Sequence, residues 1–276
     1  MKTIIVATDF TNIATNATNY AIDFCNALGY NLTLMHVVPF IIPTSEAPSP
    51  ISSQQSLYEN ASIKLSKITE ALVAKNNHRI AIQYKICEGN FIEELLTYCE
   101  TINPYVVIIG TESKTGLDRI LFGNKTMQAV KQLQWPVIIV PESIQFNGLK
   151  KIGIACDFKN VATTIPIDEI NEMVHQCNAQ LYVIHVSELN AETYDSTTIE
   201  ASGWLHDMLF HLHPKYHFLK GDNTETELIN FATQYQLDLL IVIPKKHHFI
   251  QKILTQSLSK KIILQTHTPV MAIHKY

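Results

Sequence analysis

The sequence lacks an excess of charge of either sign. Its 276 residues include 21 Lys plus Arg and 25 Asp plus Glu, a formal net charge of −4. A nucleic-acid-binding protein needs a clustered basic surface to displace counterions, so this balance argues against that class. Charged residues are only 17% of the chain and hydrophobic residues are 46%. That composition excludes a disordered chain and supplies a sizeable core.

Long apolar runs are also missing. Runs such as Val106–Ile109 and Val137–Val140 have the length of a strand, well short of the roughly 20 residues that a membrane helix needs. The N-terminal apolar run ends at Asp9, too early for the core of a signal peptide. We therefore expect a cytoplasmic protein with no membrane partner.

Metal-ligand and disulfide patterns are absent too. The five cysteines are odd in number and form no C-x-x-C pair, which favours buried thiols in a reducing compartment over a disulfide framework or zinc site. The histidines at 206, 211, 213 and 217 cluster, but Pro214 interrupts them and no H-E-x-x-H pattern occurs. Solvated or capping histidines are the favoured interpretation, and a metal site is the alternative.

The chain repeats itself in one consistent order. Apolar runs of the first half return in the second, and the first pair of runs ends in Asp-Phe in both copies. The pairs are KTIIVATDF (Lys2–Phe10) with KKIGIACDF (Lys150–Phe158), NLTLMHVV (Asn31–Val38) with QLYVIHVS (Gln180–Ser187), CEGNFIEELL (Cys87–Leu96) with LKGDNTETELI (Leu219–Ile229), PYVVIIG (Pro104–Gly110) with DLLIVIP (Asp238–Pro244), and WPVIIVP (Trp135–Pro141) with TPVMAIH (Thr268–His274). Such order indicates a duplication.

The repeat predicts two domains, 1–144 and 149–276, with the seam at Gln145–Leu149. The second copy is shorter between its second and third strands, where the first holds the Pro/Ser-rich loop PFIIPTSEAPSPISSQQS.

Helical segments alternate with the strands. Helical spacing of apolar residues predicts helices over Thr15–Leu28, Ser56–Lys75, Phe91–Cys99 and Asn124–Leu133, the first stopped by Gly29. Alternating strands and helices predict an α/β fold of two tandem doubly wound domains. Each would be a five-stranded parallel sheet with helices on both faces. In such sheets a ligand binds beyond the carboxyl ends of the strands, at the switch point.

The loop after the fourth strand carries phosphate-binding features. It contains Gly110, Gly116 and Gly123, then Asn124, a good N-cap for the helix expected to follow. Glycines let backbone N–H groups approach an anion, and a helix start favours a phosphate. Positive charge lies nearby at Lys114, Arg119 and Lys125. Tight turns alone would also explain such glycines.

These residues resemble the universal stress protein family. The resemblance rests on the strand order, Asp9 in ATDF, the strand LTLMHVV, the segment EGNFIEELL, and the loop GTESKTGLDRILFGN before WPVIIVP. It covers nearly the whole chain as two tandem Rossmann-like copies of the kind seen in adenine nucleotide alpha hydrolases. The ATP-binding branch of the family carries G-x2-G-x9-G-[S/T] after the fourth strand. Here Ser113 replaces the middle glycine and Asn124 replaces the final Ser/Thr.

The resemblance implies a pocket for ATP or a related adenine nucleotide, with Mg²⁺, in the first copy. Asp9 and the Val37 backbone would hold the adenosine end, and Gly110, Gly123 and Asn124 would line the phosphates. Thr8, Glu112, Ser113 and Lys125 complete the expected site.

Other roles remain open for several of these positions. Asp9 and its repeat Asp157 could instead cap the next helix, and His36 and His185 could be catalytic bases or buried, backbone-bonded side chains. The second copy has no glycine in its corresponding loop, where Gln256 and Ser257 replace Gly123 and Asn124. We expect it to be a structural partner. In the family that the chain resembles, the last strands of two such domains pair across a dimer, which implies that the last strand of the second copy pairs with WPVIIVP in an intramolecular pseudo-dimer. Further pairing of chains as a homodimer stays open.

The expected function is that of a stress-response regulatory protein rather than an enzyme. No G-x-S-x-G elbow or metal motif is evident, so any ATP hydrolysis would be slow and incidental. One alternative is a nucleotide-independent scaffold that acts through protein–protein contacts. Another is an enzyme of the broader nucleotide-binding α/β group.

Overall fold

The computed structural model describes residues 1–41, 50–77, 79–111, 119–158, 161–187, 196–244, 261–263 and 265–274. Its first half contains β1 (Thr3–Ala7), α1 (Asn12–Leu28), β2 (Asn31–Val38), α2 (Pro50–Lys75), β3 (Ile82–Glu88), α3 (Phe91–Ile102), β4 (Val106–Thr111), α4 (Arg119–Gln132) and β5 (Val137–Pro141). Its second half contains β6 (Lys151–Ala155), α5 (Val161–Thr164), α6 (Ile167–Cys177), β7 (Gln180–Ser187), α7 (Ser196–Leu209), the 3₁₀ helix η1 (Phe210–Leu212), β8 (Lys215–Lys220), α8 (Thr224–Gln234), β9 (Leu239–Val242) and β10 (Val270–Ala272).

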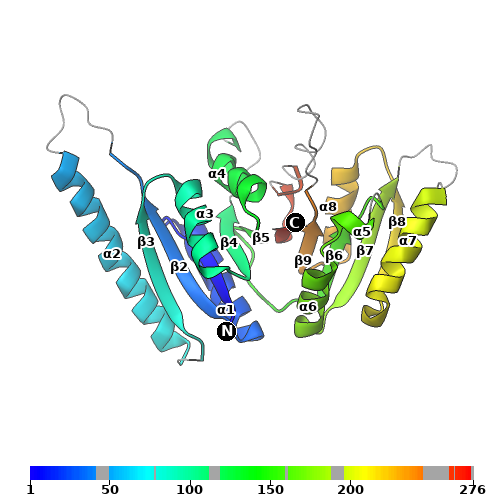
Figure 1. Ribbon diagram of the computed structural model, residues 1–276, viewed down its shortest axis with the longest axis horizontal. Helices are drawn as coiled ribbons and strands as arrows, with labels where there is room; N and C mark the ends of the chain where they lie inside the picture. Colours follow the sequence, from blue (N-terminus) through cyan, green and yellow to red (C-terminus); the bar gives the residue numbers. More distant parts are fainter. Residues whose placement is uncertain are drawn as a thin grey trace.

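The ten strands that the structure describes form one sheet in the order β3-β2-β1-β4-β5-β10-β9-β6-β7-β8. Neighbouring strands are parallel within each half. At the centre β5 and β10 pair antiparallel, with Ile138 opposite Met271. This is the pairing of final strands that the family resemblance implied. Figure 1 shows the halves side by side, with α2 at one outer end and α7 at the other.

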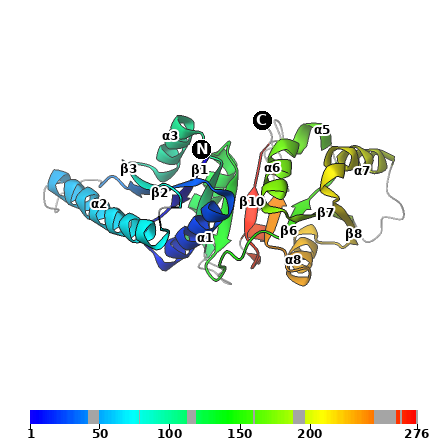
Figure 2. The ribbon, with the colours of Figure 1, turned by 90° about the horizontal axis from the view of Figure 1, so that it is seen from below.

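Helices cover both faces of the sheet, as the alternating pattern predicted. Side chains alternate along a strand, so Ile4 and Val6 of β1 join the core under α1, α2, α6 and α7. Ile5 and Ala7 face the other way and join the core under α3, α4 and α8. Figure 2 shows α3 across the strands from α1 and α2, and α8 across them from α6 and α7.

Helix ends differ from the sequence-based bounds for identifiable reasons. The first helix begins at Asn12, three residues before Thr15, because Thr11 is its N-cap and accepts from the Ala14 N–H at 3.2 Å. It ends as expected at Gly29, whose φ of 70° is the left-handed conformation that favours glycine. The third helix continues past Cys99 to Ile102, where Asn103 in the left-handed conformation ends it.

Candidate functional site

A cleft of about 450 Å³ opens at the carboxyl ends of β1, β2 and β4. The strand order places β1 between β2 and β4. The connection from β1 to β2 and the connection from β3 to β4 therefore run in opposite directions across the sheet. That is where doubly wound sheets leave room for a ligand. The N-terminal turn of α1 and residues of α3 and α4 close the sides of the cleft.

The structure brings part of the predicted site together. The cleft is lined by Thr8, Asp9, Val37, Gly110 and Lys125. Glu112 and Ser113 lie outside the described residues. Gly123 and Asn124 are placed in the backbone of α4. The convergence of residues from four separate elements therefore follows from the topology of the sheet.

The expected start of the fourth helix is wrong. The helix begins at Arg119, not near Asn124, so Asn124 is inside the helix and is not its N-cap. Nothing in the sequence of residues 119–123 prevents a helix: it contains no proline, and one interior glycine costs only about 1 kcal/mol relative to alanine. The unpaired amides at the helix start therefore lie earlier in the chain than the sequence predicted.

Gly110 has a packing role that the sequence did not reveal. A Cβ atom at this position would lie 2.8 Å from both Cγ2 and the backbone oxygen of Ile13. Its absence lets the end of β4 approach the first turn of α1. The requirement for glycine here is thus accounted for by contact between elements, independently of any phosphate.

Asp9 organises the chain between β1 and α1. Its Oδ1 accepts from the Thr11 backbone N–H at 3.1 Å and from the Thr11 hydroxyl at 2.6 Å. Thr11 in turn caps α1. Asp9 therefore supports the cap rather than serving as the cap itself. The side chain is exposed at the cleft, and its Oδ2 has no hydrogen-bond partner among the described residues.

His36 is bonded to backbone, as one of the two sequence interpretations held. Its Nδ1 lies 2.7 Å from the backbone oxygen of Thr8, and its ring packs 4.4 Å from the ring of Phe10. Because a carbonyl oxygen can only accept, Nδ1 carries the hydrogen. Burial lowers the pKa of His36, and the Thr8 hydrogen bond and Asp9 only partly offset that effect. The imidazole is therefore held mostly neutral.

The second half repeats this arrangement. His185 Nδ1 lies 2.9 Å from the backbone oxygen of Cys156. Phe158 adopts a φ of 55°, as Phe10 adopts a φ of 67°. Both Asp-Phe sites therefore share the same local backbone conformation and the same histidine-to-backbone contact. The expected replacements at Gln256 and Ser257 lie outside the described residues.

Charge in the cleft is mixed. Lys125 Nζ lies 5.7 Å from the centre of the Phe91 ring, and both residues line the cleft with Glu142. Sequence reasoning missed Phe91 and Glu142. Glu142 directly follows the fifth strand, so the rule that ligands lie at carboxyl ends could have identified it. Among the described lining residues, two carboxylates, Asp9 and Glu142, thus face one ammonium group.

The described residues offer neither a metal site nor a membrane-spanning helix. Within those ranges no three His, Cys, Asp or Glu side chains gather as a metal site would require. No described helix has the length and apolar character needed to cross a membrane.

Comparison with known proteins identifies relatives of the first half. The sequence model of the Universal stress protein family matches residues 1–141. A curated relative, "Universal stress protein MJ0531" of Methanocaldococcus jannaschii, is 26% identical over 142 residues, which cover 50% of this chain and 81% of the relative.

Solved structures resemble the whole chain. A universal stress protein from Archaeoglobus fulgidus has a TM-score of 0.77 at 15% identity, covering 99% of this chain and 98% of its own. A functionally unknown protein, PA1789 of Pseudomonas aeruginosa, has a TM-score of 0.63 at 10% identity, covering 100% of this chain and 93% of its own. At these identities the likeness concerns the fold, and it spans both halves.

Proposed function

Because the chain belongs to the universal stress protein family, which supports a role in the stress response, we propose that it is a cytoplasmic regulatory protein whose first half binds ATP or a related adenine nucleotide. The observation that carries the proposal is the cleft at the switch point of the first half. Its volume of about 450 Å³ falls in the range of roughly 300–1,000 Å³ usual for small-molecule sites.

The adenosine end of the nucleotide is the part that the described residues suit best. Asp9 offers Oδ2 as an acceptor for a ribose hydroxyl or an amino group, and its other oxygen is fixed by Thr11. Val37 lines the cleft at the end of β2, where strand pairing to β3 fixes the backbone. A preorganised acceptor beside an apolar wall is the usual form of a nucleoside site.

The phosphate end depends on Lys125 among the described residues. Its side chain lines the cleft, and a bound Mg²⁺ would reduce the net negative charge of a triphosphate there. The protein is expected to bind the nucleotide without efficient turnover. His36 is oriented by its Nδ1 hydrogen bond to Thr8, and Asp9 by the bonds that its Oδ1 accepts from Thr11.

Two observations favour the second candidate, a nucleotide-independent scaffold that contacts protein partners. Asp9 and Glu142 place two carboxylates in the cleft against Lys125. In addition, Asn124 is inside α4 rather than at its start. Both features weaken the attraction of this cleft for phosphate relative to the pattern that the sequence implied.

Isothermal titration of nucleotide-stripped protein with ATP and Mg²⁺ distinguishes the two candidates, after mass spectrometry of whatever co-purifies. The nucleotide proposal expects about one site per chain, lost in Asp9→Ala. The matched control is Asp23→Ala, which removes an exposed carboxylate from α1. Circular dichroism checks that both variants are folded.

Each result has a definite meaning. Loss of binding in Asp9→Ala but not in Asp23→Ala supports the proposed site. Unchanged affinity in Asp9→Ala removes Asp9 from it. Folded protein that neither binds ATP nor co-purifies with a nucleotide favours the scaffold.

A further inference from the structure

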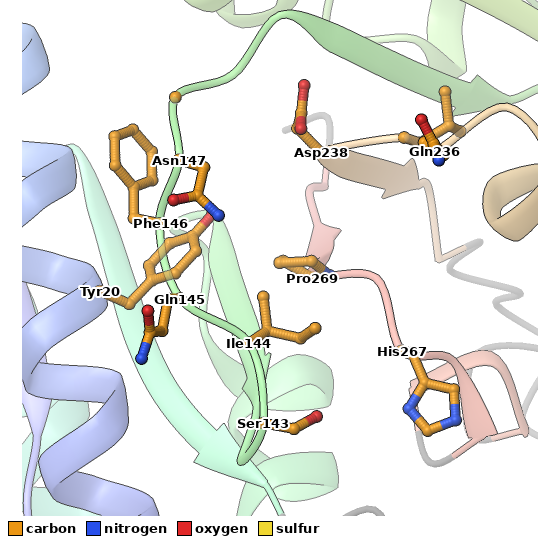
Figure 3. Close-up of a pocket in the computed structure, with 12 residues that line it drawn as sticks. Tyr20, Ser143, Ile144, Gln145, Phe146, Asn147, Gln236, Asp238, His267 and Pro269 are labelled. Atoms are coloured by element: carbon orange, nitrogen blue, oxygen red, sulfur yellow. The ribbon is translucent and has the colours of Figure 1, made fainter.

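A second cavity, of about 350 Å³, lies between the two halves. Its walls come from α1 of the first half, from the connection over residues 143–148, and from the segments that precede β9 and β10 of the second half. Figure 3 shows the labelled side chains around this space, with Tyr20 on one side and Asp238 and Pro269 across from it. The cavity exists because β5 and β10 pair and bring these segments together.

Tyr20 places an unsatisfied hydroxyl at this cavity. The residue is 2% exposed, and its hydroxyl has no hydrogen-bond partner among the described residues. A buried polar group without a hydrogen-bond partner destabilises the folded chain. Figure 3 shows the ring running from α1 toward the connection at Asn147. The Phe146 ring packs edge-on at 5.2 Å and holds the tyrosine in place.

Asp238 supplies a fixed negative charge to the same cavity. Its Oδ2 accepts from the backbone N–H groups of Lys150 and Lys151, both at 2.8 Å. Its Oδ1 has no hydrogen-bond partner among the described residues. Burial and then the Asp238 charge raise the pKa of Tyr20, so the phenol stays protonated at neutral pH. The cavity thus combines a carboxylate oxygen with a neutral hydroxyl.

The remaining walls select against an anion. None of the described lining residues is lysine or arginine, and the only basic side chain among them is that of His267, so the one permanent charge that a ligand meets there is the carboxylate of Asp238. Ile144, Phe146 and Pro269 add apolar surface beside the polar groups. A ligand that suits these walls carries one positive charge on a short apolar body.

We propose that the cavity between the halves binds a small organic cation, a primary amine on a short apolar body, with its ammonium group at Asp238 and the Tyr20 hydroxyl. Both halves contribute walls, so the bound amine contacts both and stabilises their association. The site is separate from the cleft at the end of β1, and the proposal holds whether or not that cleft binds a nucleotide.

Three ligands of matched size test the charge preference. Phenethylamine is the cation, phenethyl alcohol its neutral analogue and hydrocinnamate its anionic analogue. Titration calorimetry of the full chain, at ligand concentrations up to about 10 mM, covers the affinities expected for such small ligands. The proposal expects binding of the amine, with the alcohol at least about tenfold weaker and the acid weaker still. No binding of the amine, or equal binding of all three, overturns it.

Two variants test the assigned contacts. Tyr20→Phe removes only the hydroxyl, and Asp238→Asn keeps an acceptor for Lys150 and Lys151 while removing the charge. Each variant should bind the amine about tenfold more weakly than the wild type does. Tyr216→Phe is the matched control, because it also removes a buried, unsatisfied hydroxyl but does not line this cavity.

Tyr20→Phe has no folded-state hydrogen bond to lose, so it should fold at least as well as the wild type. Amine affinity that is the same in wild type, Tyr20→Phe and Asp238→Asn contradicts the assignment. Equal weakening in Tyr216→Phe also contradicts it.

Discussion

The side chain of His36 fastens β2 to the end of β1: its Nδ1 donates to the backbone oxygen of Thr8 at 2.7 Å. This bond holds the chain where it leaves the sheet and turns into the cleft. The second half contains the equivalent contact between His185 and Cys156, although its loop after the fourth strand differs in sequence from that of the first half. The Asp-Phe sites therefore have a structural role in holding the chain after β1 and β6, and a ligand contact at Asp9 would be additional to that role.

The lowered pKa of His36 predicts that the free energy of unfolding decreases in mild acid. Burial lowers its pKa in the folded chain, whereas the unfolded chain has an ordinary histidine pKa of about 6.5. Between these two values the unfolded chain binds more protons, so the free energy of unfolding decreases as the pH falls below about 6.5. Above that pH the contribution is fully present.

The measurement is urea denaturation of wild type and His36→Asn from about pH 8 to about pH 5. Asparagine keeps a donor near the Nδ1 position but does not titrate. The wild type should lose more stability in acid than His36→Asn. Parallel curves would show that another group governs the acid limb.

Removing the N-cap of α1 should destabilise the first half. The Thr11 hydroxyl accepts from the Ala14 N–H and donates to Asp9. Thr11→Ala loses both bonds, and the expected decrease in the free energy of unfolding is about 1 kcal/mol. Thr11→Ser keeps the hydroxyl and should retain most of the stability. Thermal and urea denaturation of the two variants would contradict the assignment if alanine and serine behaved alike.

Gly110→Ala should be destabilising by about 1–3 kcal/mol, because the new methyl group would press on Ile13. Gly203→Ala is the matched control. Gly203 lies in α7 with nothing within 4 Å of an added Cβ, so alanine should stabilise the chain by up to about 1 kcal/mol. Opposite signs in urea denaturation are the expected outcome. If Gly110→Ala left the free energy of unfolding unchanged, α1 would be able to move away from β4 with little loss of stability.

The central strand pair should carry much of the stability. Ile138 is fully buried opposite Met271, and Ile138→Ala is expected to lower the free energy of unfolding by about 2–5 kcal/mol. Ile63 on α2 is 54% exposed, and Ile63→Ala should change that free energy by no more than about 0.5 kcal/mol. Equal small effects in denaturation experiments would show that β5 and β10 contribute little.

The strands were accessible from the sequence because their signal is local. Val/Ile-rich runs bounded by turn residues mark strands, and their repetition predicted both five-stranded parallel halves. The β5–β10 pairing now observed was implied by the family resemblance, and the order of the strands within the sheet was not predicted. Gly29 ends α1 as expected. The family resemblance selected Thr8, Asp9, Val37, Gly110 and Lys125, and all five line one cleft in the structure.

Features that depend on contacts between distant segments could not be predicted from the sequence. The start of α4 at Arg119 was missed because a single glycine is a weak helix breaker, and the family pattern suggested a later start. The role of Gly110 depends on Ile13, which is distant in sequence. Glu142 was overlooked because its place in the cleft depends on β5 lying beside β4.

The sequence by itself determined the α/β class, the alternation of parallel strands with helices in both halves, and the edge of the sheet at which a ligand could lie, because periodicity and strand ends are properties of neighbouring residues. Only the tertiary structure decided that His36 and Asp9 serve the framework. It alone revealed a cavity between the halves with Tyr20 and Asp238 facing it. Burial and close approach arise when segments far apart in the chain meet, and no local pattern encodes which polar atom is left without a partner there.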